Sequence, residues 1–355
     1  MNPLKEILVI GGTGAQGQEV VKALSLSQRY SVRVLTRNLL SERAQELLAL
    51  PNVALIQGHQ DNQKDLHSAF HGIYGAYVNT DGFTLGEKSE LFYGIRAYEI
   101  ARHEHVSHYI WANTDYAVKK AGWDEKYHWG HNDAKGRVGD LILSHGQAGM
   151  KTSLLTTGPY MDMLFDGMFV PQKQSDGSFL WANPSNNGKI PLIALEDVGT
   201  YALWMFDHIE ESAGMNLEVA TEEVSFQDIV KTFTNVTGLK AAHKYIPLEE
   251  YLPLAEPYSN ASANWAADSS VARDESSMTW RENFSAWWRF WGEGLGADRN
   301  FEIMDRIHPR RIKSLAEWMT RVGYRGEHKS VLKGIADLKA KVELDESGNT
   351  SGPRV

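Results

Sequence analysis

The chain has 355 residues, of which 42% are hydrophobic and 23% are charged, as is usual for a globular protein with a sizeable core. The formal net charge of −9 argues against direct binding of nucleic acid, because attraction to phosphates needs a basic face. Without cysteine, disulfides, thiolate metal sites and a catalytic thiol are excluded, and a reducing compartment is favoured.

The N-terminus lacks the pattern of a signal peptide, and no apolar run approaches the length of a membrane span. We therefore expect a cytoplasmic protein that does not associate with a membrane. A local basic stretch, "HPRRIK" at 308–313, is better explained as the solvated entry to a helix than as a nucleic-acid site.

Short apolar runs alternate with amphipathic stretches through the first half of the chain. The spacing between the apolar runs leaves room for a helix in each gap, and one such helix is expected from Ser41, as its N-cap, to Leu50, before Pro51. Strands alternating with helices indicate βαβ crossovers, so residues 1–158 are predicted to form an α/β domain with a doubly wound parallel sheet. The predicted strands are 7–11, 31–37, 53–58, 75–80, 108–113 and 152–158.

After Gly158 the pattern changes. Residues 188–209 predict a short strand and then a helix with its N-cap near Glu196 or Asp197. Residues 216–221 predict one more buried strand. These segments are expected to return to the first domain, so that the two domains interleave.

The rest of the chain reads as a second, mainly helical domain over residues 159–341. A helix is predicted over 225–238, with Ser225 and Asp228 as a variant of the capping box and Gly238 as its stop. From about residue 249 the pattern is helical and rich in aromatic residues, which either pack a core or form a roof over an apolar substrate. The aromatic residues that share one helical face are Trp280, Phe284, Trp287, Trp288 and Trp291. Residues 342–355 are polar and predicted to be a flexible tail.

The segment "VIGGTGAQGQEVV" (9–21) carries a glycine fingerprint. It satisfies G-x-G-x-x-G at Gly12, Gly14 and Gly17, and G-x-x-G-x-x-G from Gly11. The motif follows a predicted strand and opens a predicted helix, which is the context of a Rossmann dinucleotide-binding turn. Glycines there allow a tight turn and let a pyrophosphate approach the helix N-terminus, so we predict a bound dinucleotide.

The end of the second strand indicates which dinucleotide is bound. NAD enzymes place an acidic residue there against the ribose hydroxyls, whereas NADP enzymes offer an arginine to the 2′-phosphate. This chain has Arg37 in "LTRN" and no acidic residue beside it, which favours NADP(H). Arg33 is a weaker candidate, and a solvated surface arginine is the alternative for Arg37.

Six motifs together resemble the NmrA-like family of atypical short-chain dehydrogenase/reductases. They are "GGTGAQG", "VRVLTRN", "QGHQDN", "HNDAKG", "PQKQSDGSF" and "ADRNFEIMDRIHPRRIKSLAEWM", and the similarity extends to about residue 325. The resemblance implies a Rossmann domain that binds NADP(H) and a smaller C-terminal domain that forms a cleft with it. The family includes NADPH-dependent reductases and redox-sensing regulators that bind the dinucleotide without known turnover.

The resemblance also implies cofactor contacts, all at the carboxyl ends of parallel strands. Thr13 and Gln16 in the glycine loop would hold the pyrophosphate, and Arg37 the 2′-phosphate. The other implied contacts are Asp61 and Asn62 at the adenine, Asn79, Thr80 and Lys135 at the nicotinamide ribose, and Gly158, Pro159 and Tyr160 beside the nicotinamide.

The chain departs from the family pattern at the reaction site. The tyrosine expected four residues before Lys135 is His131, and the serine expected after the fifth strand is replaced by Asn113 and Thr114. Reduction of a carbonyl needs a proton for the developing alkoxide, which His131 or Tyr160 could supply while Asn113 or Thr114 polarises the carbonyl. The alternative is that His131 is only a polar residue in the first turn of a helix.

Three histidines lie close together in "HEHVSH", at His103, His105 and His108. A metal site needs converging ligands, and the stretch lacks a carboxylate pair at helical ligand spacing, so a structural role is expected and no metal is predicted. Histidines near the end of a helix are also favoured by its dipole.

Two functional hypotheses follow. The favoured one is an NADPH-dependent reductase acting on a carbonyl, imine or activated alkene of a small aromatic molecule. The alternative is a non-catalytic NADP(H)-sensing regulator that binds a partner protein. The substrate and the oligomeric state stay open.

Overall fold

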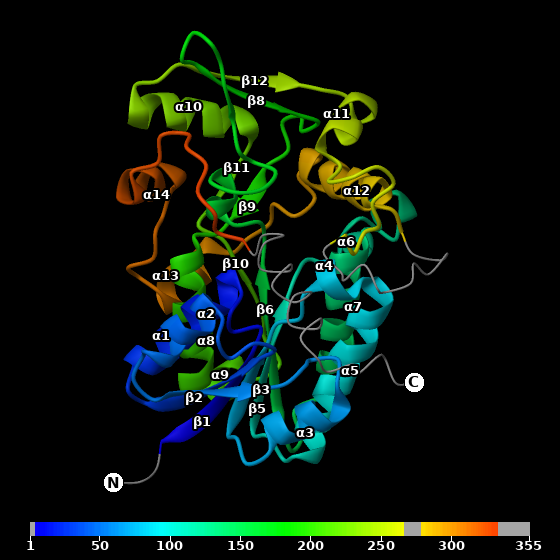
Figure 1. Cartoon of the computed structure of the whole chain (residues 1–355), viewed down its shortest axis with the longest axis vertical. Helices are drawn as coiled ribbons and strands as arrows, with labels where there is room; N and C mark the ends of the chain where they lie inside the picture. Colours follow the sequence, from blue (N-terminus) through cyan, green and yellow to red (C-terminus); the bar gives the residue numbers. More distant parts are fainter. Residues whose placement is uncertain (1–3, 266–277, 333–355) are drawn as a thin grey trace.

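The computed structural model describes residues 4–265 and 278–332. Its centre is a seven-stranded sheet in the order β10-β6-β5-β4-β1-β2-β3, with every neighbouring pair parallel (Figure 1). The chain leaves β1 toward β2 and β3 on one side and continues through β4, β5 and β6 on the other. The carboxyl ends of β1 and β4 therefore flank the crevice where ligands bind in such sheets. The strands are β1 (Lys5–Ile10), β2 (Tyr30–Thr36), β3 (Val53–Gln57), β4 (Gly75–Val78), β5 (His108–Asn113), β6 (Lys151–Thr157) and β10 (Asn216–Val219).

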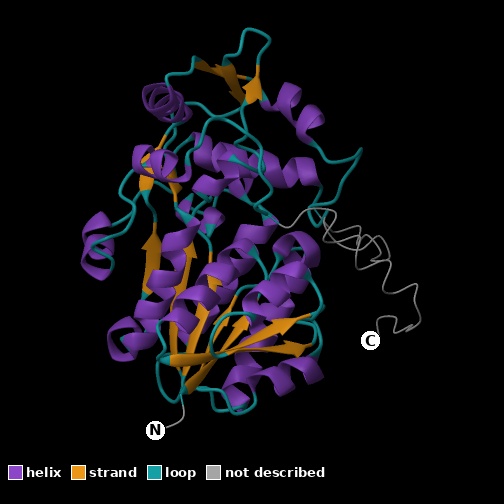
Figure 2. Cartoon of the chain, turned by 60° about the vertical axis from the view of Figure 1, so that its left-hand side comes forward, coloured by secondary structure: helices purple, strands orange, loops and turns teal. Residues whose placement is uncertain are grey.

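Helices cover both faces of this sheet, as Figure 2 shows. Within β1, Ile7 and Val9 enter one core while Leu8 and Ile10 enter the other, because successive side chains point to opposite faces. The first core includes side chains from α1 (Ala15–Leu26), α2 (Glu42–Leu48), α8 (Leu195–Asp207) and α13 (Phe301–Ile307). The second includes side chains from α3 (Gln63–Phe70), α5 (Glu87–His103) and α7 (Gly130–Ser144). The predicted doubly wound α/β architecture is confirmed.

Two segments after residue 158 do return to the first sheet. β10 pairs in parallel with β6, and α8 packs beside α1. Helix α8 begins two or three residues earlier than expected, with Ala194 as its N-cap and no side-chain capping bond, so the prediction of a cap near Glu196 or Asp197 was wrong. The caps at Ser41 and at Ser225 with Asp228 are confirmed.

A smaller unit lies over the carboxyl edge of the sheet, at the top of Figure 1. It contains two small sheets, one with the order β12-β8-β7 and one with the order β11-β9. Of their strands the sequence predicted only β9, which pairs with β11 here and not with the large sheet. Their strands are β7 (Gln172–Lys173), β8 (Phe179–Asn183), β9 (Ile190–Leu192), β11 (Glu222–Val224) and β12 (Ala241–Tyr245). The helices around them are α10 (Phe226–Thr237), α11 (Leu248–Ala255), α12 (Trp280–Gly292) and α14 (Leu315–Val322).

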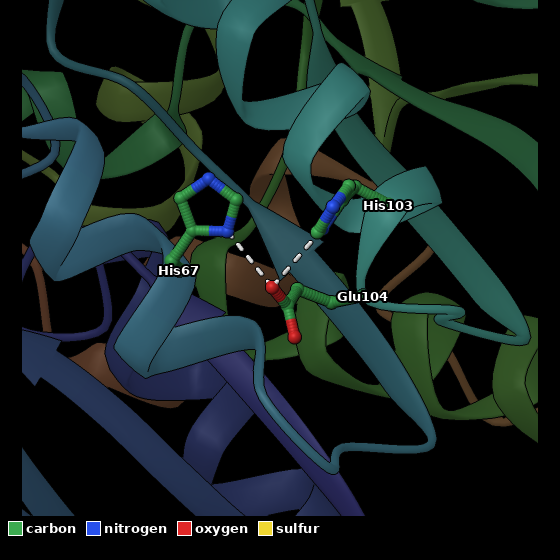
Figure 3. A group of neighbouring side chains, drawn as sticks. All are labelled: His67, His103 and Glu104. Carbon is green, nitrogen blue, oxygen red and sulfur yellow. Dashed lines mark hydrogen bonds and ion pairs between the residues drawn. The ribbon is translucent and has the colours of Figure 1, made fainter.

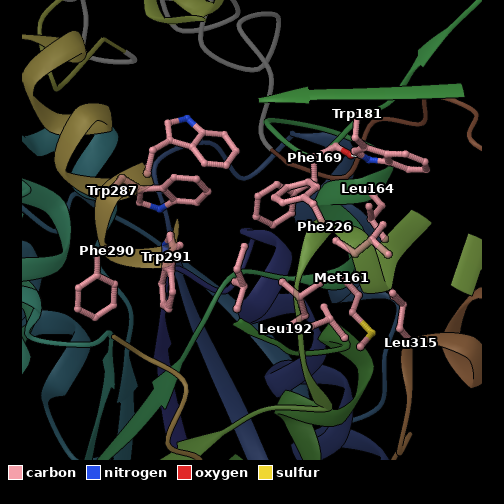
Figure 4. Close-up of a cluster of buried hydrophobic side chains, with 14 of the residues drawn as sticks. Met161, Leu164, Phe169, Trp181, Leu192, Phe226, Trp287, Phe290, Trp291 and Leu315 are labelled. Carbon is pink, nitrogen blue, oxygen red and sulfur yellow. Dashed lines mark hydrogen bonds between the residues drawn. The ribbon is translucent and has the colours of Figure 1, made fainter. Parts of the chain in front are cut away.

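The aromatic stripe of α12 forms the core of this unit (Figure 4). Trp288 and Trp291 are 0% and 1% exposed, and the other three members are no more than 6% exposed. Met161 and Leu164, which follow β6, belong to the same core, so the carboxyl edge of the large sheet is continuous with the smaller unit. The interpretation of the stripe as core is confirmed, and the alternative of a roof over substrate does not hold.

Short helical turns complete the loops at the carboxyl edge of the large sheet, and one more lies at the opposite edge. Among the described ranges 4–265 and 278–332, no helix is both long and apolar enough to cross a membrane. The predicted flexible tail, 342–355, lies outside the described residues. The turns are α4 (Gly82–Leu85), α6 (Ala117–Lys120), η1 (Glu125–Tyr127) and η2 (Met161–Leu164) at the carboxyl edge, and α9 (Ile209–Ser212) at the other.

Candidate functional site

The glycine loop joins β1 to α1 at the crevice. Gly11 has φ +79, and a β-carbon there would overlap the backbone carbonyl of Asn79 at the end of β4. A β-carbon on Gly17 would overlap the carbonyl of Gly11, so the helix sits against the loop without room for a side chain. The loop therefore has no side chains on the side where β1 and β4 end, so that a pyrophosphate can approach its backbone.

The N-terminus of α1 has backbone N–H groups without a side-chain partner. Its N-cap is Gly14, which makes no side-chain capping bond, whereas Ser41 and Asn62 cap α2 and α3 with their side chains. The first N–H groups of a helix have no partner within the helix, and together with the helix dipole they attract anions. Glycine loop and open helix end thus fit a dinucleotide pyrophosphate.

Arg37 is half-buried and follows β2, the strand that pairs with β1. Within the part of the chain that the structure describes, its guanidinium makes no hydrogen bond or ion pair, so it is available to a phosphate. Arg33 is committed elsewhere: it pairs with Glu6 at 2.5 Å and donates to the carbonyl of His71 at 2.9 Å. Of the two arginines, Arg37 is therefore the one with an uncommitted guanidinium within the described residues, and its contact with a 2′-phosphate stays a prediction.

Lys135 points from α7 to the end of β4. Its Nζ donates to Asn79 Oδ1 at 3.2 Å, to the Thr80 carbonyl at 2.8 Å and to Thr80 Oγ1 at 3.0 Å. The same nitrogen lies 3.1 Å from Glu90 Oε1. Asn79, Thr80 and Lys135, which the resemblance groups at the nicotinamide ribose, are thus brought together next to Gly11.

Glu90 of α5 is the residue of this cluster that sequence reasoning missed. Its side chain is 0% exposed, and Oε1 also accepts a hydrogen bond from Thr80 Oγ1 at 2.7 Å. Burial raises the pKa of Glu90, while the ammonium of Lys135 and the hydroxyl of Thr80 act to lower it. A buried carboxylate behind a lysine fixes the position of its ammonium group. The available signal was that Glu90 shares the buried face of α5 with Gly94 and Ala97.

His131 lies in the first turn of α7, held by Asn283 of α12. Asn283 Oδ1 accepts a hydrogen bond from the Gly130 N–H at 3.0 Å. His131 Nδ1 lies 3.1 Å from Asn283 Nδ2 and 3.3 Å from Oδ1, and the shorter contact corresponds to the tautomer with the ring proton on Nε2. The ring packs 4.5 Å from Phe83 and 6.0 Å from Phe284, centroid to centroid. Burial lowers the pKa of His131 to about 4, so the imidazole is neutral at pH 7.

Tyr160, after β6, connects to the glycine loop through Gln16. Its hydroxyl donates to Gln16 Oε1 at 2.8 Å, and Gln16 Nε2 donates in turn to the hydroxyl of Tyr77. Burial raises the pKa of Tyr160, which keeps the phenol protonated. Gly158 lies against the carbonyl of Pro191, and the Pro159 carbonyl accepts from the Ile193 N–H at 3.1 Å. Gln16 and Tyr160 therefore meet at the crevice.

Two predicted polarising residues lie in other surroundings. Asn113 Nδ2 donates to Thr156 Oγ1 at 2.9 Å on the next strand, and Asn113 is 6% exposed. Thr114 Oγ1 donates to the carbonyl of Asn132 at 3.3 Å. These bonds lead to β6 and to α7, and the catalytic role of both side chains stays a prediction.

The two predicted adenine contacts are at the end of β3. Asn62 caps α3, because its Oδ1 accepts from the N–H groups of Lys64 and Asp65. Asp61 is exposed and lies 3.8 Å from His59. Their contact with adenine stays a prediction.

A buried ion pair near the site was also missed. Asp115, two residues after β5, pairs with Arg299 at 2.7 Å, and both side chains are 0% exposed. The guanidinium and Lys120 hold the pKa of Asp115 below its usual range. The pair spans 184 positions of the chain and no local pattern signals it. It ties the end of β5 to the segment that precedes α13.

The three histidines of "HEHVSH" do not converge. His108 is buried with Nε2 at 3.2 Å from Ser153 Oγ, and burial lowers its pKa to about 4. His105 is exposed and has φ +58. His103 lies 3.3 Å from Glu104 Oε1. As a group they have no common ligand position.

Comparison with known proteins places the chain among relatives of the same fold. Its sequence is 25% identical over 277 residues to the NmrA-like family domain-containing oxidoreductase malD of Malbranchea aurantiaca, covering 70% of this chain and 77% of the relative. The structure superposes on NmrA, a negative transcriptional regulator crystallised in complex with NADP, with a TM-score of 0.70, 20% identity and coverage of 90% and 95%. It also superposes on the NADPH-dependent quinone oxidoreductase QOR2 of Escherichia coli, with a TM-score of 0.68, 15% identity and coverage of 90% and 100%.

The predicted dinucleotide cofactor agrees with these neighbours, since proteins of this fold have been crystallised with NADP or with NAD. The model of the NmrA-like family matches residues 3–266, which include the glycine loop, Arg37, Lys135 and Tyr160. The chain therefore belongs to the NmrA-like family.

Proposed function

We propose that the protein is an NADPH-dependent reductase that delivers hydride to a carbonyl, imine or activated alkene of a small aromatic molecule. The observation that carries the proposal is the pairing of two donors one turn apart on α7. Lys135 is fixed at the end of β4 by Asn79, Thr80 and Glu90, and His131 presents an Nε2–H group among aromatic rings. Membership of a family that includes proteins named as oxidoreductases supports it.

The residues present fit NADPH. The bare glycine loop and the uncapped N-terminus of α1 would hold the pyrophosphate, and the unpaired guanidinium of Arg37 would hold the 2′-phosphate. Lys135 would bind the ribose hydroxyls. When bound, NADPH supplies a hydride from C4 of its nicotinamide.

His131 acts in this scheme as a neutral donor. With its pKa lowered to about 4, the imidazole of His131 is unprotonated and uncharged at pH 7. Its Nε2–H would donate a hydrogen bond to the substrate oxygen or nitrogen. Such a bond stabilises the negative charge that develops there as hydride arrives. Phe83, which packs on the same ring, gives an apolar contact that favours an aromatic substrate. The protonated phenol of Tyr160 is the candidate source of the final proton.

The test is NADPH oxidation, followed at 340 nm, with a panel of quinones, aromatic aldehydes, enones and cyclic imines. We expect His131→Phe to lower kcat by about 10²–10³-fold, the range for loss of one oxyanion donor, with the Kd for NADPH unchanged. Lys135→Met is expected to raise the Kd for NADPH. If NADPH binds but no member of the panel is reduced above background, the reductase is ruled out for these acceptor classes and the proposal fails.

A second candidate function is a dinucleotide-sensing regulator. It is favoured by the same low pKa of His131, because a neutral imidazole is a poor proton donor, and by the name of the structural neighbour NmrA. A redox sensor must bind NADP⁺ and NADPH with different affinity, because a ligand shifts an equilibrium only by its differential affinity. Calorimetric titration that gives equal Kd values for the two forms would count against it.

A further inference from the structure

His67, His103 and Glu104 converge at the edge of the large sheet that lies opposite the dinucleotide crevice. His67 is in the last turn of α3, His103 ends α5, and Glu104 is the C-cap of α5. Glu104 Oε1 lies 2.8 Å from His67 Nδ1 and 3.3 Å from His103 Nδ1. Figure 3 shows both rings turned toward this carboxylate oxygen.

We propose that these three side chains bind a divalent transition-metal ion, with Zn²⁺ the best match. One ligand atom from each residue, a ring nitrogen from each histidine and a carboxylate oxygen from Glu104, lies within 4.8 Å of the other two. Two ligands of a tetrahedral Zn²⁺ ion are about 3.3 Å apart, given bonds of about 2.0–2.1 Å. Imidazole and carboxylate are the donors that Zn²⁺ accepts, and a water molecule would complete the four positions. The two distances from Glu104 Oε1 to the histidine Nδ1 atoms, 2.8 and 3.3 Å, are within about 0.5 Å of this value. No pair of ligand atoms is more than 4.8 Å apart, so each pair needs to approach by at most about 1.5 Å.

The surroundings hold the ligands in place. His71 Nδ1 lies 3.1 Å from Glu104 Oε2, the carboxylate oxygen left free by the metal, and such outer contacts orient metal ligands. Arg33 donates to the carbonyls of Ala69 and His71 at 2.9 Å each, which fixes the end of α3. Both helices are anchored in the core of the large sheet. The site is therefore built on fixed backbone.

The partners of Glu104 favour a metal over a simple ion pair. Within the described residues, its carboxylate pairs with the three imidazoles of His67, His71 and His103. Imidazoles become metal ligands when neutral, whereas lysine and arginine do not ligate metals. The sequence-based expectation of no metal considered His103 with His105 and His108, whereas its partner Glu104 meets His67 across 37 positions.

A metal ion at this position would link the end of α3 to the end of α5, and it would not contact the proposed reaction site. α3 leads into β4 and α5 leads into β5, so these helix ends lie where the strands begin. The dinucleotide crevice lies where the same strands end. The inference therefore does not depend on the proposed reductase activity.

The experiment uses the full chain, free of any histidine tag and of chelator, with ZnCl₂ as the probe in calorimetric titration and thermal unfolding. We expect one saturable site per chain and a higher Tm with Zn²⁺. His67→Gln/His103→Gln should weaken binding at least 100-fold and abolish the rise in Tm. His71→Ala should weaken it about 10-fold, as removal of an outer-shell partner does. The matched control is His59→Ala, an exposed histidine 3.8 Å from a single carboxylate, which should bind like the wild type.

Two controls separate a lost site from a damaged fold. In EDTA the double variant should retain the far-ultraviolet circular dichroism of the wild type, and its affinity for NADPH should be unchanged. If the double variant misfolds, His103→Gln alone serves as the second variant, with at least 10-fold weaker binding expected. Zn²⁺ binding of the same affinity and stoichiometry in these variants, or no saturable binding to the wild type, would overturn the proposal.

Discussion

Replacing Lys135 by methionine removes the positive charge that faces the buried carboxylate of Glu90 and keeps the apolar stem. In the structure Lys135 Nζ lies 3.1 Å from Glu90 Oε1, and the Glu90 side chain is 0% exposed. Removing one partner of a buried ion pair lowers the free energy of unfolding by about 3–5 kcal/mol, because the other charge is left buried without a partner. This is a large part of the roughly 5–15 kcal/mol that stabilises a typical domain. We expect Lys135→Met to lose about 3–5 kcal/mol of unfolding free energy at pH 8.

The loss should depend on pH, because the stranded carboxylate can take up a proton. Burial already raises the pKa of Glu90, and removal of the lysine charge that opposes this shift raises it further. A carboxyl group with a higher pKa in the folded state than in the unfolded state costs stability as the pH rises through the folded-state pKa. The variant should therefore be penalised most at pH 8 and distinctly less at pH 5.

The assay is urea unfolding of the cofactor-free protein at both pH values. Glu90→Gln/Lys135→Met should recover most of the loss at pH 8, because no charge is then left buried. The matched control is Lys119→Met, which breaks an exposed pair with Asp140 at 2.6 Å and should cost at most about 1 kcal/mol at either pH. An equal loss of unfolding free energy at pH 5 and pH 8 that Glu90→Gln does not relieve would show that no charge is left buried at Glu90.

Three further variants test other parts of the account. Arg37→Glu should weaken NADPH binding by about 10–100-fold in a fluorescence titration and change NADH binding little, because a carboxylate repels the 2′-phosphate; equal weakening of both would contradict this. Gly17→Ala should abolish dinucleotide binding, since its methyl group would overlap the Gly11 carbonyl, and retained affinity would argue against the glycine-loop site. Burial lowers the pKa of His108 from its ordinary value near 6.5 to about 4. The neutral, buried His108 therefore leaves the folded state at full stability above pH 6.5, and the folded state loses stability as the pH falls from 6.5 toward 4, because only the unfolded state takes up a proton there. In His108→Gln the free energy of unfolding should fall less steeply between pH 6.5 and pH 4 than in the wild type, by up to about 1.4 kcal/mol per pH unit. The same slope for variant and wild type would contradict this expectation.

The large sheet and the cofactor loop were predictable because their signals are local. β1 and β2 are runs of buried apolar residues, and the glycine motif joins a strand directly to a helix. The small sheet of β7, β8 and β12 was missed, since β7 has two residues and β12 has no buried residue. Short strands of this kind are defined by tertiary packing more than by their own sequence.

The site residues divide in the same way. Arg37 and Lys135 were predicted from their positions after a strand and in a helix, whereas Glu90 was not considered because a glutamate in a helix normally faces water. Asn283 had a detectable signal, since it falls three residues after Trp280 on the buried face of α12. The pair of Asp115 and Arg299 had none, because only the fold brings the two segments together.

The most direct test of the central claim is a crystal structure of the protein with NADPH bound. We expect the 2′-phosphate on Arg37, the pyrophosphate at the N-terminus of α1, a ribose hydroxyl on Lys135, and the nicotinamide beside His131, with the Nε2 atom of His131 facing the position of a substrate. A dinucleotide bound with its 2′-phosphate away from Arg37 and its nicotinamide out of reach of His131 and Tyr160 would contradict it.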